Sequence, residues 1–140
     1  MEVGFEVTGE VTDRATVKPG DAFNDDCPGR HVLNHVTSRW GVLILSALSA
    51  GPLRFYMLRD RIGGISEKML SQNLRILVRD GLIQRKVEPA APPRVSYALT
   101  PLGAGLALRT QGVVDWITLH ANDITEAQRQ YDSAVGDAGP

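Results

Sequence analysis

The chain has 140 residues, 43% of them hydrophobic, which is enough for one domain with an apolar core and further elements at its ends. It has no run of about 18 apolar residues, and its N-terminus is acidic where a signal peptide would be basic and then apolar, so we expect a cytoplasmic protein with no membrane partner. The formal net charge of −1 hides an uneven distribution, because residues 28–100 carry +7 between acidic ends of −5 (residues 1–27) and −3 (residues 101–140); such a basic centre suits a polyanionic partner.

Residues 1–26 form an acidic arm in which apolar residues alternate as in one short strand (Val3, Phe5 and Val7). The folded part begins at Cys27. Pro28 suits a first helical turn, and the apolar residues after it predict a short helix that ends near Thr37.

A second helix is predicted over residues 39–50, with Ser38 as its N-cap and Gly51-Pro52 as its end. Because this segment is apolar nearly all round, it should be buried. A third helix is predicted over residues 55–62, and Gly63-Gly64 forms the turn that follows it. Its apolar residues should face inward (Phe55, Leu58 and Ile62).

The helix with the best-defined ends is predicted within residues 65–81, where Ser66 is the N-cap and Gly81 the C-terminal stop. Helical spacing places its leucines on one side, and on the other side it places Lys68, Ser71, Gln72, Arg75 and Arg79. In an isolated helix such a polar face is usually only solvated surface. Here, however, a buried helix and a Gly-containing turn precede it, which is the order of a helix-turn-helix.

Residues 82–87 and 94–99 alternate in polarity and predict two antiparallel strands, joined by a Pro-rich loop, that together form a wing. A long helix then starts at Thr100-Pro101 and extends to about His120, and Thr125 caps a last helix over residues 126–135. The long helix has more apolar surface than a small winged domain needs, so we expect it to pair with a second copy through Leu102, Leu106, Val113, Trp116 and Ile117.

Three stretches carry a resemblance to a known family: CPGRHVLNHVTSRWGVLIL, GPLRFYMLRDRIGGISEKMLSQNLRILVRDGLIQR and PPRVSYALTPLG. From Cys27 to about Trp116 the chain resembles the HxlR-type winged helix-turn-helix transcriptional regulators of bacteria, relatives of the MarR group. It departs from the usual pattern at Ser38-Arg39, where many members have Gly-Lys. The resemblance implies a mainly α fold with a small β-hairpin wing and additional N- and C-terminal dimerisation helices. The expected organisation is an acidic arm (residues 1–26), a winged domain (27–120) and a C-terminal helix and tail (121–140).

The expected partner is double-stranded DNA, because Arg, Lys and Gln read base edges in the major groove while Ser contacts bases or phosphates. The candidate contacts on the helix are Ser66, Lys68, Ser71, Gln72, Arg75 and Arg79, and those near the wing, for phosphates or the minor groove, are Arg54, Arg85, Lys86 and Arg94. For the wing residues, the alternative is a set of solvated charges on a hairpin.

Cys27 is the only cysteine, so neither an intramolecular disulfide nor a zinc cluster is expected. The helix start and the nearby Arg30, His31 and His35 favour a reactive, redox-sensing thiolate, whereas Asp25 and Asp26 oppose it. The resemblance leaves both roles open, because several members sense oxidants at this cysteine and others retain it without known sensing. An inert structural thiol is the alternative.

No other chemistry is expected of the chain: two histidines at i and i+4 make a weak metal site, and a Cys–His nucleophile lacks an orienting group, so we predict no metal, no cofactor and no enzyme activity. A tryptophan at the edge of a cavity can stack on an aromatic effector, so a small-molecule ligand at the dimer interface stays open. The sequence therefore predicts a homodimeric DNA-binding regulator, a repressor on a pseudo-palindromic operator. The rival is a winged-helix interaction module that docks on an acidic protein.

Overall fold

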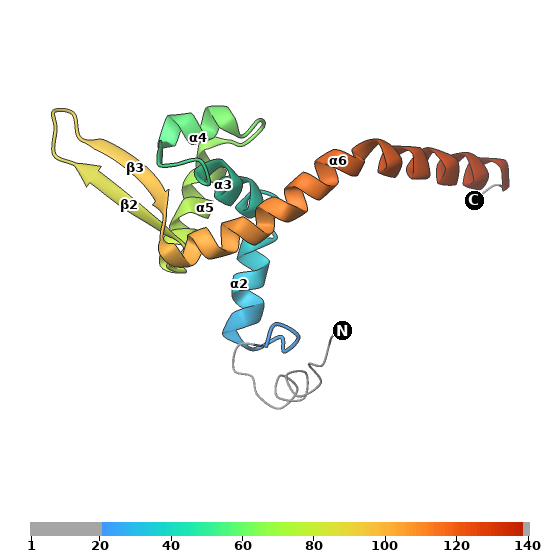
Figure 1. Cartoon of the computed structure of the whole chain (residues 1–140), viewed down its shortest axis with the longest axis horizontal. Helices are drawn as coiled ribbons and strands as arrows, with labels where there is room; N and C mark the ends of the chain where they lie inside the picture. Colours follow the sequence, from blue (N-terminus) through green and yellow to red (C-terminus); the bar gives the residue numbers. More distant parts are fainter. Residues whose placement is uncertain (1–20, 139–140) are drawn as a thin grey trace, which may run out of the picture.

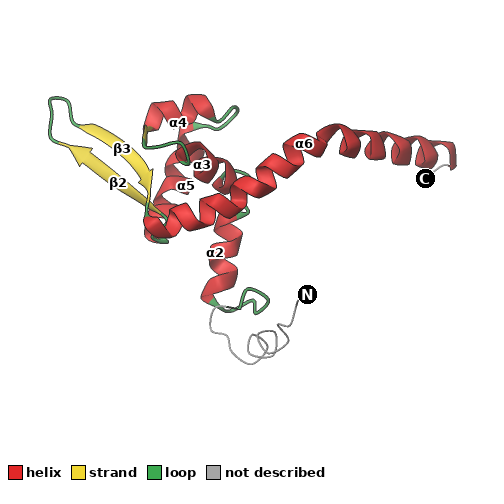
Figure 2. Cartoon of the chain, in the orientation of Figure 1, coloured by secondary structure: helices red, strands yellow, loops and turns green. Residues whose placement is uncertain are grey.

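A computed structural model describes residues 21–138 of the chain (Figures 1 and 2). Its elements are, in order, α2 (Pro28–Val36), α3 (Gly41–Leu48), β1 (Leu53–Arg54), α4 (Phe55–Arg61), α5 (Glu67–Arg79), β2 (Ile83–Glu88), β3 (Arg94–Leu99) and α6 (Pro101–Ala138). The strand predicted around Val3, Phe5 and Val7 and most of the acidic arm lie outside the described residues.

The three strands form one antiparallel sheet in the order β1-β3-β2. The β2–β3 hairpin is the predicted wing, and it extends from the helical body at the left of Figure 1. The two-residue strand β1, which was not predicted, pairs with β3 through Leu53–Tyr97 and Arg54–Ser96. The mainly helical winged helix-turn-helix fold is thus confirmed.

The core lies where α3, α4, α5 and the base of the sheet meet, and its fully buried side chains are Ile44, Leu45, Leu58, Leu70, Leu74, Leu77 and Ile83. The prediction for the second helix was wrong in two respects. The helix α3 begins at Gly41 with Trp40 as its N-cap, not at residue 39, and Leu43 is exposed rather than buried. Ser38 still stabilises the turn before it, because its hydroxyl accepts from the Gly41 N–H at 3.1 Å.

Both predicted ends of α5 are confirmed. The Ser66 hydroxyl accepts a hydrogen bond from the Met69 N–H at 3.1 Å, which satisfies one of the free donors of the first turn. At the other end, Gly81 takes a φ of 78° and two backbone hydrogen bonds close the helix, from Gly81 to Val78 and from Leu82 to Leu77. This is a Schellman motif, which glycine adopts without steric cost.

The prediction of two C-terminal helices was wrong: α6 is a single helix of 38 residues and does not break before Thr125. Glu126 lies where the separate helix was expected to start, and hydrogen bonds from Arg129 and Gln130 lower its pKa while supporting the continuous helix. The first half of α6 crosses α3, and the second half extends away from the body (Figure 1). Within residues 21–138 no helix combines the length and apolar character needed to cross a membrane.

Candidate nucleic-acid interface

The polar face of α5 lies at the surface, as its spacing predicts. Ser66, Lys68, Ser71, Gln72, Arg75 and Arg79 are all exposed, whereas the leucines on the opposite side are 0–1% exposed. In the described part of the chain, none of the three basic side chains of this face forms an ion pair. They are therefore available to an external anion.

A recess of about 300 Å³ separates α5 from the wing. Its lining includes Ser71 and Arg75 from α5 and Arg85 and Tyr97 from the two wing strands. Arg85 pairs with Tyr97 across the hairpin, and directly paired residues project from the same face of a sheet, so both face α5. Two arginines and a tyrosine thus line the same recess.

The other basic residues of the sheet project from its opposite face. Arg54 and Lys86 both pair with Ser96, from the two neighbouring strands, and Arg94 lies two residues before Ser96 on β3. The four basic sheet residues predicted from the sequence therefore divide, with Arg54, Lys86 and Arg94 on one face and Arg85 on the other. Arg85 and Lys86 lie on opposite faces because they are consecutive in β2, whereas the face of Arg54 depends on the register of β1, a strand that was not predicted.

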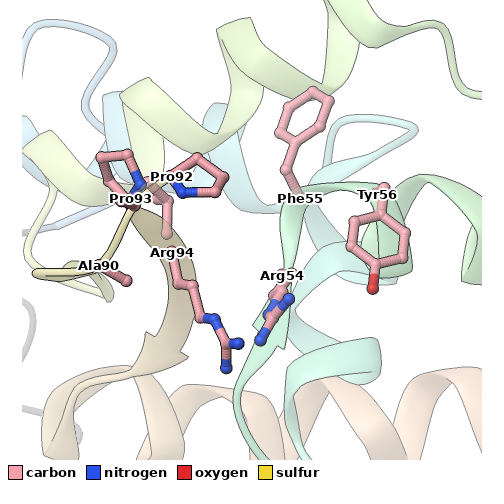
Figure 3. A pocket seen from close by; sticks show the side chains of 9 residues that line it. Arg54, Phe55, Tyr56, Ala90, Pro92, Pro93 and Arg94 are labelled. Carbon is pink, nitrogen blue, oxygen red and sulfur yellow. The ribbon is translucent and has the colours of Figure 1, made fainter.

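A pocket of about 460 Å³ lies between the start of α4 and the Pro-rich wing loop. The guanidinium groups of Arg54 and Arg94 extend into it next to each other, while the Phe55 ring points away from them (Figure 3). Tyr56, exposed at 47%, also lines the pocket and was not among the predicted site residues. The only sequence signal for Tyr56 was its place on the predicted third helix. Phe55, Leu58 and Ile62 were expected to face inward there, which leaves Tyr56 on the outer side.

An exposed ion pair spans the turn between α4 and α5. A guanidinium nitrogen of Arg59 on α4 lies 2.7 Å from a carboxylate oxygen of Glu67, the first residue of α5. Hydrogen bonds to Glu67 and Asp60 raise the pKa of Arg59. The negative charge of Glu67 also suits the N-terminus of α5. Arg59 thus differs from the basic residues of the α5 face in having acidic partners within its own chain.

Comparison with known proteins identifies the family. Residues 35–125 match the HxlR-like helix-turn-helix family. The chain belongs to this family. It is 50% identical to the HTH-type transcriptional regulator YtfH of Escherichia coli K12 over 108 residues, which cover 77% of this chain and 86% of YtfH.

Two solved structures agree with this assignment. The transcriptional regulator ytfH from Salmonella typhimurium is 50% identical and superposes with a TM-score of 0.73. The match covers 79% of this chain and 98% of the ytfH chain. The oxidised form of the redox regulator HypR is 29% identical with a TM-score of 0.61, and 66% of this chain covers 95% of it. This HxlR-like chain is therefore a transcriptional regulator with a helix-turn-helix domain, and not an enzyme.

The single cysteine of this HxlR-like chain is buried, with 6% of its surface exposed, at the N-terminus of α2. Its thiol donates a hydrogen bond to the backbone carbonyl of Asp21. Two of the three groups expected to stabilise a thiolate bind elsewhere: Arg30 donates to the carbonyls of Ala22 and Phe23, and His35 contacts Asp80. Arg30 and His35 thus have hydrogen-bond partners other than the sulfur, and the redox role of Cys27 stays a prediction.

The residues predicted for the dimer interface lie on the first half of α6. Four of them are between 49% and 67% exposed in the single chain, namely Leu102, Val113, Trp116 and Ile117. Leu106 differs because it is partly buried against the core of its own chain. Exposed apolar side chains continue along the helix at Ile124 and Tyr131, in helical register with Ile117.

Proposed function

We propose that this HxlR-like regulator binds a pseudo-palindromic operator as a homodimer and represses transcription, with one α5 in the major groove of each half-site. The observation that carries the proposal is the exposed face of α5, whose basic side chains form no ion pair within residues 21–138. A major groove about 12 Å wide admits one helix, and its base edges offer the acceptors that Arg and Lys recognise.

Within this proposal the predicted residues have two kinds of role. Lys68, Gln72 and Arg75 read base edges, while Ser66, Ser71 and Arg79 contact bases or the flanking phosphates. Arg85 and Arg75 face each other across the recess between α5 and the wing, which follows from the lining of that recess. Arg54, Lys86 and Arg94 bind phosphates or enter the minor groove from the opposite face of the sheet.

A salt titration tests the proposal. Retention on non-specific duplex DNA should weaken steeply between about 50 and 200 mM salt, because each phosphate contact releases counterions. Operator selection from a random duplex pool should then enrich a site with two-fold symmetry. Absent or salt-insensitive retention would instead favour the rival function, a winged-helix module that docks on an acidic protein.

A second candidate function is a response to oxidants through Cys27. The similarity to HypR, which is a redox regulator, favours it. In this chain the thiol is buried and contacts the backbone carbonyl of Asp21, so an oxidant reaches it only if residues 21–26 move. Since Cys27 is the only cysteine, diamide would accept two electrons and two protons from two thiols, forming a disulfide between subunits or with a small thiol.

We expect diamide to change the operator affinity of the wild type and to have no effect on Cys27→Ser, whose affinity without oxidant stays unchanged. Electrophoresis without reductant would show the intersubunit disulfide, and mass spectrometry the mixed one. A Cys27→Ser protein that still responds to diamide, or a wild type that does not respond, would leave Cys27 as a structural thiol.

A further inference from the structure

One contact joins the N-terminal helix to the end of the recognition helix. The His35 Nδ1 of α2 lies 2.6 Å from a carboxylate oxygen of Asp80, 45 residues later in the chain. The side chain of His35 is 26% exposed and that of Asp80 only 7%. No other ion pair within residues 21–138 involves either group.

The position of Asp80 is unfavourable without this contact. Asp80 is the C-cap of α5, where the helix dipole repels a negative charge. Its near-complete burial also removes most of the water that would otherwise solvate the carboxylate. His35 supplies the hydrogen bond and, when protonated, the opposite charge that offset both costs.

His35 itself has little freedom to move. The Ser38 hydroxyl donates to its backbone carbonyl at 2.9 Å. A Cβ atom on Gly41, the first residue of α3, would come within 2.3 Å of the same carbonyl oxygen, so α3 packs directly against this peptide. The ring therefore extends from a fixed backbone to the end of α5.

The same end of α5 is bound by α6 and the residue before it. The Thr100 hydroxyl donates to the carbonyl of Gly81 at 2.6 Å, and the Thr100 N–H donates to the carbonyl of Leu82 at 3.0 Å. Residues 80–82 thus connect the recognition helix both to α2 and to the helix that we expect to form the dimer. A shift of α2 relative to α6 would act on α5 at this point.

We propose that His35 is a positioning residue for DNA binding, whose contact with Asp80 fixes the orientation of α5. The inference rests on the proposed function. The other charged or titratable side chains on the packed segments are Arg30 and His31 on α2, Arg39 before α3, and Glu67, Lys68, Arg75 and Arg79 on α5. Within residues 21–138 none of them forms an ion pair with Asp80, so the orientation of this end of α5 depends on His35.

The test compares operator affinity for five proteins: the wild type, two single variants, their double variant and a control. His35→Asn keeps an amide donor near the position of Nδ1 but loses the charge, and Asp80→Asn removes the charge of the partner. The matched control is His31→Gln, one turn earlier on α2, where the ring is exposed. Unfolding curves identify the temperature at which every variant is folded, and affinities are compared there.

We expect His35→Asn and Asp80→Asn each to bind the operator about tenfold more weakly than the wild type, and the double variant to lose no more than either single one. His31→Gln should bind like the wild type. A contact that serves only the fold would alter the unfolding curves and leave the operator affinity of the folded protein unchanged.

Several results would overturn the inference. A His35→Asn protein that binds like the wild type would do so, and so would losses that add in the double variant. If the wild type binds no duplex DNA at any pH, the proposed function fails together with this inference, whereas normal wild-type binding with unaffected variants rejects only the role of His35.

Discussion

Individual basic residues on this surface differ in what surrounds them, and their expected roles differ accordingly. Arg75 lies centrally on the polar face of α5 and lines the recess beside the wing. Arg94 lies at the base of the wing loop, next to Arg54 and on the face opposite Arg85. A side chain inside the major groove reads bases, whereas one at the edge of the wing contacts the uniform phosphate backbone.

We predict that Arg75→Ala weakens binding to the selected operator by roughly 1–3 kcal/mol and relaxes its sequence preference, because a base-edge contact is lost. Affinity measurements on the operator and on random duplex DNA would check this. Equal losses on the two DNAs would instead place Arg75 among the phosphate contacts.

For Arg94→Ala we predict a similar loss on every DNA sequence and a salt dependence shallower by about one unit, since one phosphate contact disappears. The measurement is the slope of log affinity against log salt concentration. An unchanged slope would remove Arg94, and with it this side of the wing, from the interface.

At the scale of elements, the start of α6 packs closely on the turn after α5. A Cβ atom on Gly103 would lie 1.9 Å from the Leu82 carbonyl oxygen, so no side chain fits there. A Cβ atom on Gly112, in the same helix, would meet no neighbouring atom within 4 Å. The two glycines therefore differ in kind: the first is required by packing, and the second is only a weak helix former.

We predict that Gly103→Ala lowers the free energy of unfolding by roughly 1–3 kcal/mol, because backbone atoms must shift to accept the methyl group. Gly112→Ala, the matched control, should raise it by up to about 1 kcal/mol through better helix propensity. Urea unfolding of both variants would check this. A Gly103→Ala protein as stable as the wild type would show that α6 can move away from Leu82.

The elements that could be predicted from the sequence are those with local signals. Ser66 and Gly81 define α5 because capping depends on residues a few positions apart, and the same holds for Thr100-Pro101 at the start of α6. Thr125 was also predicted as a cap, but the chain continues as helix through it. A local capping signal thus gave a wrong helix boundary, because the same polar residue can also lie on the exposed face of one long helix.

The features that could not be predicted depend on contacts between distant segments. The strand β1 exists only because β3 lies beside it, and its register decides that Arg54 and Arg94 share a face. The pairing of His35 with Asp80 likewise joins residues 45 positions apart. The exposed polar face of α5 could therefore be predicted, but not the face of the sheet on which Arg54 lies or the contact between His35 and Asp80.

At the scale of the whole molecule, charge and apolar surface are separated. The basic side chains gather on the winged domain, whereas residues 115–136 of α6 carry Asp115, Asp123, Glu126 and Asp132 against a single Arg129. A phosphate backbone would attract the first region and repel the second. We therefore expect α6 to point away from DNA, which leaves its apolar stripe free for a second copy.

The last prediction concerns that stripe. The Trp116 ring is 56% exposed and stacks only on His120, one turn later, at a centroid distance of 4.3 Å. Truncating it should therefore disturb the isolated chain little, while a dimer would lose one of its largest apolar contacts. We predict that Trp116→Ala lowers both dimer affinity and operator affinity, because only the dimer holds two recognition helices about 34–36 Å apart.

Sedimentation at several protein concentrations and operator titration would measure the two losses. The matched control is Leu108→Ala, which is 72% exposed on the same helix but lies outside the stripe by helical spacing. Binding to a single half-site distinguishes a loss of dimerisation from damage to the DNA-binding surface. The affinity of Trp116→Ala for a half-site should equal that of the wild-type monomer, because each α5 is intact. A Trp116→Ala protein that stays dimeric and binds the full operator normally would exclude this part of α6 from the dimer interface.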